Sequence, residues 1–168
     1  MKPSDHPEFF QFPAPAGRSR ESTIVLDAVG RFWHDGAKVE HSRMARAFFS
    51  WIQKHPDDGR YILSNGYDWT YLTVEDVPLF IDAVSRPDES SLLLHLSDGT
   101  QELLDPESLS SGPGNATYAR VKDGQMEARF RQEAQTGLMP LLEPGADGDP
   151  WLQLAGRQYA FKRRGSQA

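Results

Sequence analysis

Two adjacent carboxylates, Glu75 and Asp76, stand where the sequence changes from a strand-like pattern to a predicted helix that begins at Pro78. At such a junction they could bind a cation, pair with an arginine, or act as a base whose pKa the neighbouring charge raises. Alternatively, Asp76 satisfies the helix N-terminus and Glu75 pairs with a basic residue. Both interpretations stay open, because ion pairs that only hold a fold are common at such junctions.

Glu127 and Arg129 form a second polar pair. They are two residues apart on a predicted strand, so their side chains share one face. An arginine there is a reasonable partner for Glu75 or Asp76 across an interface between two halves of the chain. It could equally hold an anionic ligand.

His34 is the remaining candidate, because Asp35 follows it directly and a histidine beside a carboxylate can do acid–base work or ligate a metal. Asp35-Gly36, however, also suits a tight turn, and no His-Glu-x-x-His spacing is present. We therefore predict neither a metal site nor a catalytic residue, and no cofactor can be named. The candidate ligand-binding residues are Glu75, Asp76, Glu127, Arg129 and His34.

The composition excludes several classes of protein. With 24 acidic and 18 basic residues the net charge is −6, which argues against a dedicated nucleic-acid binder. No cysteine is present, so disulfides and thiolate chemistry are impossible. No apolar run approaches membrane-spanning length and the N-terminus has no secretory signal, so we expect a soluble cytoplasmic protein without a membrane partner.

The elements that must position these residues follow from the apolar pattern. Residues 1–22 are rich in proline and phenylalanine and should form an irregular arm lying along the folded body. Strands are predicted near 24–26, 31–34 and 37–39, followed by a helix over about 41–54 with Phe48 fully buried. Two further strands precede Glu75, and the short helix from Pro78 should end at Arg86-Pro87.

The second half repeats this plan in pattern, with little residue identity. Strand signals are followed by a predicted helix over 132–142, an acidic loop and a last hairpin. Tyr61 follows the acidic loop of the first half as Trp151 follows that of the second. The pattern indicates an internal duplication.

Three segments together resemble a known family: LDAVGRFWHDGAKVEHSRMARAFFSWI, YLTVEDVPLF and YARVKDGQMEARF. They are similar to the uncharacterised bacterial family called domain of unknown function 1285, over roughly residues 23 to 162. The chain departs from it at Leu79, where the family usually has an aromatic residue directly after the proline. The resemblance implies an α+β fold of two related units and a role in ligand binding or signalling.

We therefore predict an α+β fold of two similar small units, each with antiparallel strands and one principal helix. The expected organisation is an arm at 1–22, an N-terminal unit at 23–88 and a C-terminal unit at 89–168. The expected function is a non-enzymatic module that binds a small ligand or a protein partner in the cleft between the units. The alternatives are a hydrolase or metal-dependent enzyme using Glu75 and Asp76, and a structural protein-interaction module.

Overall fold

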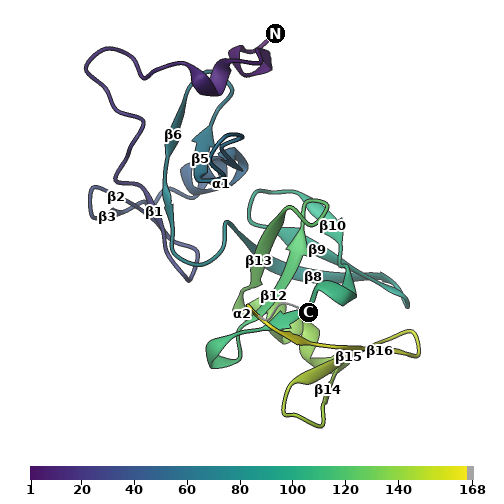
Figure 1. Ribbon diagram of the computed structural model, residues 1–168. Coiled ribbons are helices and arrows are strands. Elements are labelled where there is room, and N and C mark those ends of the chain that lie inside the picture. Colours follow the sequence, from purple (N-terminus) through teal and green to yellow (C-terminus); the bar gives the residue numbers. More distant parts are fainter. Residues whose placement is uncertain (166–168) are drawn as a thin grey trace. The chain divides into compact units, whose positions relative to one another are not determined.

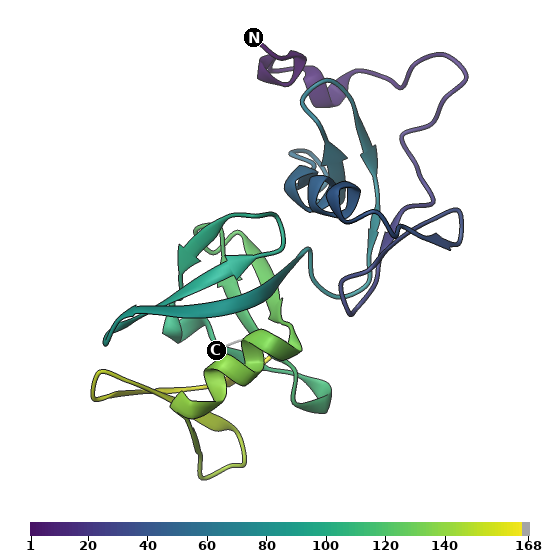
Figure 2. The same ribbon diagram turned by 180° about the vertical axis from the view of Figure 1, so that it is seen from behind.

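The computed structural model describes residues 1–165, which divide into two compact units (Figures 1 and 2). The first unit runs from Met1 to Pro78 and the second begins at Leu79. Strands dominate both, and within the described chain each unit contains one α-helix, so the predicted α+β class is confirmed. None of the helices among residues 1–165 has the length and apolar character needed to span a membrane.

The first unit contains two small sheets and the helix between them. One sheet has the order β3-β2-β1-β7 and the other the order β4-β5-β6. The elements are β1 (Val25–Leu26), β2 (Phe32–His34), β3 (Ala37–Lys38), α1 (Ser42–Trp51), β4 (Ile52–Lys54), β5 (Tyr61–Ser64), β6 (Trp69–Tyr71) and β7 (Thr73–Val74).

Helix α1 matches the predicted helix but is shorter and rotated. Its backbone turns extended at Ile52, which begins β4 and pairs with Leu63 of β5. The prediction that Phe48 is fully buried is wrong: Phe49 is the buried residue, 5% exposed, and Phe48 is only half-buried. Both rings contact Phe32 of β2, at centroid distances of 5.3 and 4.7 Å. The predicted apolar face of the helix is therefore correct, but the residue at its centre is Phe49, one position after the predicted Phe48.

The N-terminal arm, predicted only to lie along the folded body, packs on the β4-β5-β6 sheet. Its short 3₁₀ helices span Pro3–Asp5 and Phe9–Gln11. Phe9 forms a buried cluster with Ile62 and Trp69, and Phe10 packs beside it. His55 Nδ1 accepts a bond from the Asp57 backbone N–H at 3.1 Å, so Nε2 carries the hydrogen and donates to the Phe10 carbonyl, also at 3.1 Å.

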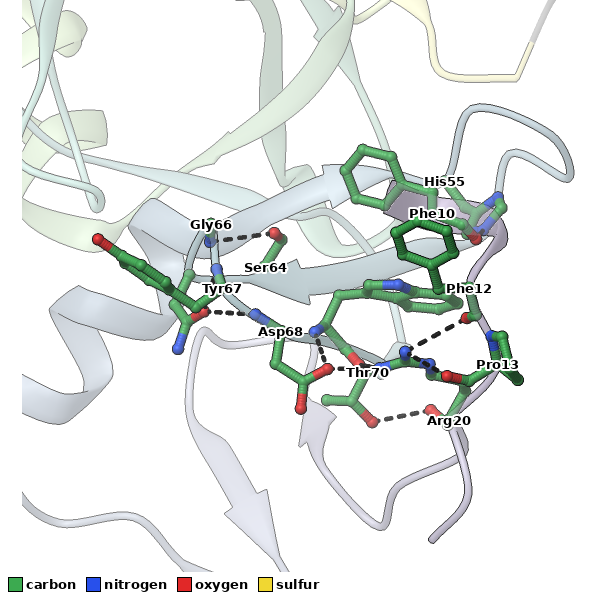
Figure 3. Close-up of polar contacts among 12 residues, drawn as sticks. Phe10, Phe12, Pro13, Arg20, His55, Ser64, Gly66, Tyr67, Asp68 and Thr70 are labelled. Carbon is green, nitrogen blue, oxygen red and sulfur yellow. Dashed lines mark hydrogen bonds and ion pairs between the residues drawn. The ribbon is translucent and has the colours of Figure 1, made fainter. Parts of the chain in front are cut away.

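Arg20 fastens the end of the arm to the same sheet (Figure 3). Its guanidinium donates to the carbonyls of Phe12 and Pro13, at 3.3 and 3.1 Å, and to the Trp69 carbonyl at 2.8 Å. It also pairs with Asp68 and lies 4.4 Å from the centre of the Trp69 ring. One planar cation thus joins the arm, a strand and a turn.

The second unit contains a larger sheet, of order β10-β9-β8-β13-β12-β11-β17, and a three-stranded sheet, β14-β15-β16. Short 3₁₀ helices lie at Pro106–Ser108, Pro113–Asn115 and Met139–Leu141. The other elements are β8 (Leu79–Asp88), β9 (Ser91–Leu96), β10 (Gln101–Leu103), β11 (Ser110–Ser111), β12 (Thr117–Val121), β13 (Met126–Phe130), α2 (Gln132–Leu138), β14 (Leu142–Pro144), β15 (Pro150–Leu154), β16 (Arg157–Ala160) and β17 (Lys162–Arg163).

The predicted duplication is confirmed in topology, with different limits. The order β3-β2-β1-β7, in which β1 and β7 are parallel, recurs as β13-β12-β11-β17, in which β11 and β17 are parallel. A helical segment and a three-strand meander connect β3 to β7 in the first repeat and β13 to β17 in the second. The two repeats are therefore β1 to β7 and β11 to β17, and β8 to β10 stand outside them.

Backbone hydrogen bonds at matched positions support this correspondence. Thr73 N–H donates to the Ile24 carbonyl at 3.0 Å, as Lys162 N–H donates to Leu109 at 3.1 Å. Similarly, Leu72 N–H donates to Tyr61 and Phe161 N–H to Pro150, both at 3.3 Å. These bonds align the two repeats residue by residue.

The helix predicted from Pro78 is wrong, because residues 79–88 form the long strand β8. Leu79, Phe80 and Ile81 pair in parallel with β13, and Ile81 onward pairs with β9. All three side chains are at most 1% exposed, as expected of a strand buried on both faces. This pairing also places residues 79–88 in the second unit, so the units divide at Pro78 and not after residue 88.

Candidate functional site

A pocket of about 220 Å³ lies within the first unit, between α1 and the β4-β5-β6 sheet. Its apolar walls come from α1, β5 and the residue before β1, and its polar rim comes from the turn between β5 and β6 and from β6. The lining residues are Ile24, Phe48, Trp51, Leu63, Asn65, Asp68, Trp69 and Thr70.

The alternation of the meander separates this pocket from the arm. Leu63 and Thr70 are register partners on one face of β5 and β6, the face that lines the pocket. Ile62 and Trp69 project from the opposite face, where Phe9 covers them, and Trp69 also borders the pocket. The arm thus covers one face of the β4-β5-β6 sheet, and the pocket lies on the other face.

The aromatic wall of the pocket follows from helical spacing. Phe48 and Trp51 are three residues apart on α1, so their rings meet on one face, with centroids 5.8 Å apart. Both are half-buried. A pair of partly accessible aromatic rings gives a surface against which a planar or apolar group can pack.

The rim of the pocket is polar and rigid. Asn65 Oδ1 accepts bonds from the backbone N–H groups of Tyr67 and Asp68, at 2.8 and 2.9 Å, which hold the turn. Asp68 accepts from Arg20 at 2.5 Å and from the Trp69 N–H at 2.9 Å. Partial burial acts to raise the pKa of Asp68, but these hydrogen bonds outweigh it and leave the pKa below its usual range. Asp68 is therefore ionised at neutral pH, and the Arg20 guanidinium balances its charge.

The second repeat has a packed core at the same positions. Leu109 stands at the place of Ile24, Leu138 at that of Phe48 and Leu152 at that of Leu63. All three leucines are fully buried. Leu154, only 3% exposed, occupies the position of the exposed Asn65. Along the helix the buried position shifts by one residue, since Phe49 is 5% exposed and its counterpart Met139 is 62% exposed. The pocket is thus lined by residues of the first repeat whose counterparts in the second repeat are buried.

Glu75 and Asp76 lie after β7, away from the lining of this pocket. The Glu75 backbone N–H donates to the Leu26 carbonyl at 2.9 Å, which extends the β1–β7 pairing, and its side chain is exposed. Asp76 is half-buried. The prediction that Glu75 and Asp76 precede a helix is wrong, because residues 79–88 form β8. The predicted role of these two carboxylates in binding stays a prediction.

Glu127 and Arg129 lie in β13, as predicted, but have different surroundings. Glu127 accepts two bonds from Arg164, from Nε and an Nη nitrogen, both at 3.2 Å. The Arg129 guanidinium lies 5.8 Å from the centre of the Tyr118 ring, its register partner on β12. Arg164 packs closer to the same ring, at 4.2 Å. Glu127 is therefore half of a bidentate ion pair within the second unit.

His34 stands at the end of the β2–β3 hairpin. Its Nε2 is 3.6 Å from the Asp35 carboxylate, and both side chains are more than half exposed. Asp35 and Gly36 have φ of 51° and 78°, which is the conformation of the tight turn that the sequence indicated. Residues 1–165 contain no group of three or more acidic or histidine side chains arranged to hold a metal ion.

Asp27 is the most strongly perturbed acid of the first unit, and the sequence analysis did not single it out. It is 8% exposed. Oδ1 accepts from the N–H groups of Val29 and Arg31, and Oδ2 from Arg31 Nε and Trp33 Nε1, all at 2.8–3.1 Å. Burial acts to raise the pKa of Asp27, but these bonds outweigh it and hold the pKa at about 2. Asp27 therefore fastens the β1–β2 turn.

We expect Asp27 to make the first unit sensitive to acid. Its pKa in the unfolded chain is about 3.9. The carboxylate therefore stabilises the fold above about pH 4, and this contribution is lost as the pH falls towards 2. Asp27→Asn should lower the free energy of unfolding at pH 7 by about 2 kcal/mol and flatten its dependence on pH between 4 and 2. Urea unfolding at several pH values measures both effects.

The matched control is Asp35→Asn, since Asp35 is exposed in the neighbouring turn and an asparagine tolerates its positive φ. This variant should keep the acid dependence of the natural protein. An unchanged slope between pH 4 and 2 in Asp27→Asn would contradict the role assigned to Asp27.

Comparison with solved structures confirms the resemblance at the level of the fold. A DUF1285 family protein from Silicibacter pomeroyi aligns with a TM-score of 0.65 and 18% identity, over 95% of this chain and 88% of its own. A second DUF1285 family protein, from Shewanella baltica, aligns with a TM-score of 0.58 and 19% identity, over 73% of this chain and 94% of its own. No family model and no curated protein matches the sequence.

Proposed function

We propose that the protein is a binding module whose first unit takes up a small, largely apolar molecule in the pocket beside α1. The observation that carries this proposal is the open position of Ile24, Phe48 and Asn65, where the second repeat buries leucines. A packed core could have been built at this place, since the other repeat builds one with the same topology. Keeping it open costs packing energy, which favours a functional reason.

The size and lining of the pocket limit the ligand. A dry cavity of about 150 Å³ is enough to hold benzene, so a pocket of about 220 Å³ suits one substituted aromatic ring or a metabolite of similar size. The Phe48 and Trp51 rings favour a planar group. Asp68 and Asn65 at the rim favour a hydrogen-bond donor on the ligand's outer edge, because a carboxylate only accepts.

Filling the pocket should abolish binding without unfolding the protein. Ile24→Phe adds a ring at the pocket wall, where the backbone is extended and tolerates an aromatic residue. We expect one or more probes from a set of small aromatic donors, phenol and indole among them, to raise the melting temperature of the natural protein but not of Ile24→Phe. A thermal-shift titration, with Trp51 indole chemical shifts followed by NMR, measures this.

Leu103→Phe provides the matched control, because it adds the same ring at a position that is 57% exposed on β10 of the second unit. This variant should respond to the same probes as the natural protein. If Ile24→Phe were stabilised as strongly as Leu103→Phe, or if no probe shifted the Trp51 signal, the pocket would not be the binding site.

A further inference from the structure

In the second unit a strand covers the outer edge of the repeat. β8 runs parallel to β13, with Leu79 beside Ala128 and Ile81 beside Phe130. It also packs on α2, where the Cβ of Val84 lies against Gly137. As a result Ala128 and Ala134 are fully buried, and Phe130 is 3% exposed.

The first repeat leaves the same edge open. β3 stands at the place of β13, and no strand among residues 1–165 pairs with its outer side. Ala37 and Lys38 are exposed there. Met44 of α1 holds the position of Ala134 and is 49% exposed, although a methionine is much the larger hydrophobic residue. An open strand edge beside an exposed apolar side chain is the arrangement to which an extended peptide can add.

The hydrogen bonds of β3 show which backbone groups face outward. Val39 N–H donates to the Phe32 carbonyl at 2.9 Å, so the groups of Val39 point towards β2. Because successive residues of a strand alternate, the N–H and carbonyl of Lys38 point away from β2, to the open side. Lys38 therefore offers one donor and one acceptor to an incoming strand.

The charges around this edge indicate an acidic partner. In the second unit Asp82 of β8 pairs with Arg131, the residue before α2, at 3.0 Å. In the first unit His41 precedes α1, and Lys38, Arg43 and Arg46 are exposed on β3 and α1. Glu40, also exposed, is the one acidic residue between β3 and α1, so basic side chains outnumber acidic ones along this edge. The sequence of α1, SRMARAFFSW, contains two arginines and no acidic residue.

We propose that β3 and the Met44 side of α1 dock an extended, acidic and apolar segment of a partner protein, which runs parallel to β3 as β8 runs parallel to β13. Apolar side chains of this segment cover Met44 and Ala37, and a carboxylate at the position of Asp82 faces His41 and Arg43. Ala37, Lys38 and Met44 do not line the small-molecule pocket, although Met44 lies one helical turn before Phe48, and the proposal does not depend on the pocket.

The chain provides its own probe, a synthetic peptide with the sequence of residues 77–89, which contains β8. ¹⁵N NMR titration should show the Lys38 and Met44 signals shifting on binding, with the second unit unaffected. Lys38→Pro should weaken binding at least tenfold, because it removes the outward N–H, whereas a proline with this orientation is tolerated on an edge strand. Asp82→Lys in the peptide should weaken it several-fold.

Lys38→Ala provides the control, because it keeps the outward N–H, and should bind within a few-fold of the natural protein. Met44→Glu tests the helix side independently of the strand and should also weaken binding at least tenfold. Binding that Lys38→Pro and Met44→Glu leave unchanged would overturn the proposal. It would also be overturned by concentration-dependent self-association of the chain that Lys38→Pro abolishes, since the occupant would then be a second copy.

Discussion

Replacing Phe9 by alanine should lower the free energy of unfolding of the first unit by about 3–5 kcal/mol. Phe9 is 5% exposed and forms a buried cluster with Ile62 and Trp69. Its removal leaves a cavity over the meander that a surface arm cannot collapse to fill, because Arg20 fastens the arm at Asp68 and Trp69. Denaturant unfolding followed by tryptophan fluorescence measures this loss.

Phe12→Ala is the matched control, because Phe12 belongs to the same arm and is 46% exposed. It should cost less than about 1 kcal/mol. Equal losses of stability for the two variants would mean that the arm stabilises the first unit only by being attached to it, and not by burying Phe9. A loss below about 1 kcal/mol for Phe9→Ala would mean that the arm does not complete the core of the first unit.

The sequence was sufficient to predict that the chain is duplicated and that an arm lies on the body, but not the limits of the repeats, since β8 to β10 lie outside them. Apolar periodicity marked both helical segments and the meander strands, and these are properties of neighbouring residues. The three phenylalanines of the arm were also informative, because apolar rings are costly to leave in water wherever the chain runs. Ile62 and Trp69 pack against Phe9 and Phe10, whereas Phe12 is 46% exposed. The second repeat has Trp151 at the place of Ile62 and Gln158 at the place of Trp69.

The element after Pro78 could not be predicted in the same way. Leu79, Phe80, Ile81, Ala83 and Val84 fit a helical face and a buried strand equally well, since a short apolar run has no distinctive period. The deciding factor is β13, which lies far along the chain and offers β8 its edge. Pairing of this kind overrides local propensity.

The pocket was missed because no local pattern contains it. Ile24, Phe48 and Asn65 come from three separate elements and are ordinary residues in each. Adjacent charged residues such as Glu75-Asp76, in contrast, are visible in the sequence directly. The comparison that reveals the pocket needs the strand register of both repeats, which sets Phe48 against Leu138.

The paired variants Phe48→Ala and Leu138→Ala test most directly whether the first unit keeps a pocket where the second keeps a core. Native-state hydrogen exchange reports the stability of α1 and α2 separately. Leu138→Ala should lower the stability of α2 by about 2–5 kcal/mol, as expected for a fully buried leucine. Phe48→Ala should lower that of α1 by no more than about 1.5 kcal/mol, although it removes the larger side chain. A loss at Phe48 that equals or exceeds the loss at Leu138 would show that both positions are core, and would contradict the pocket.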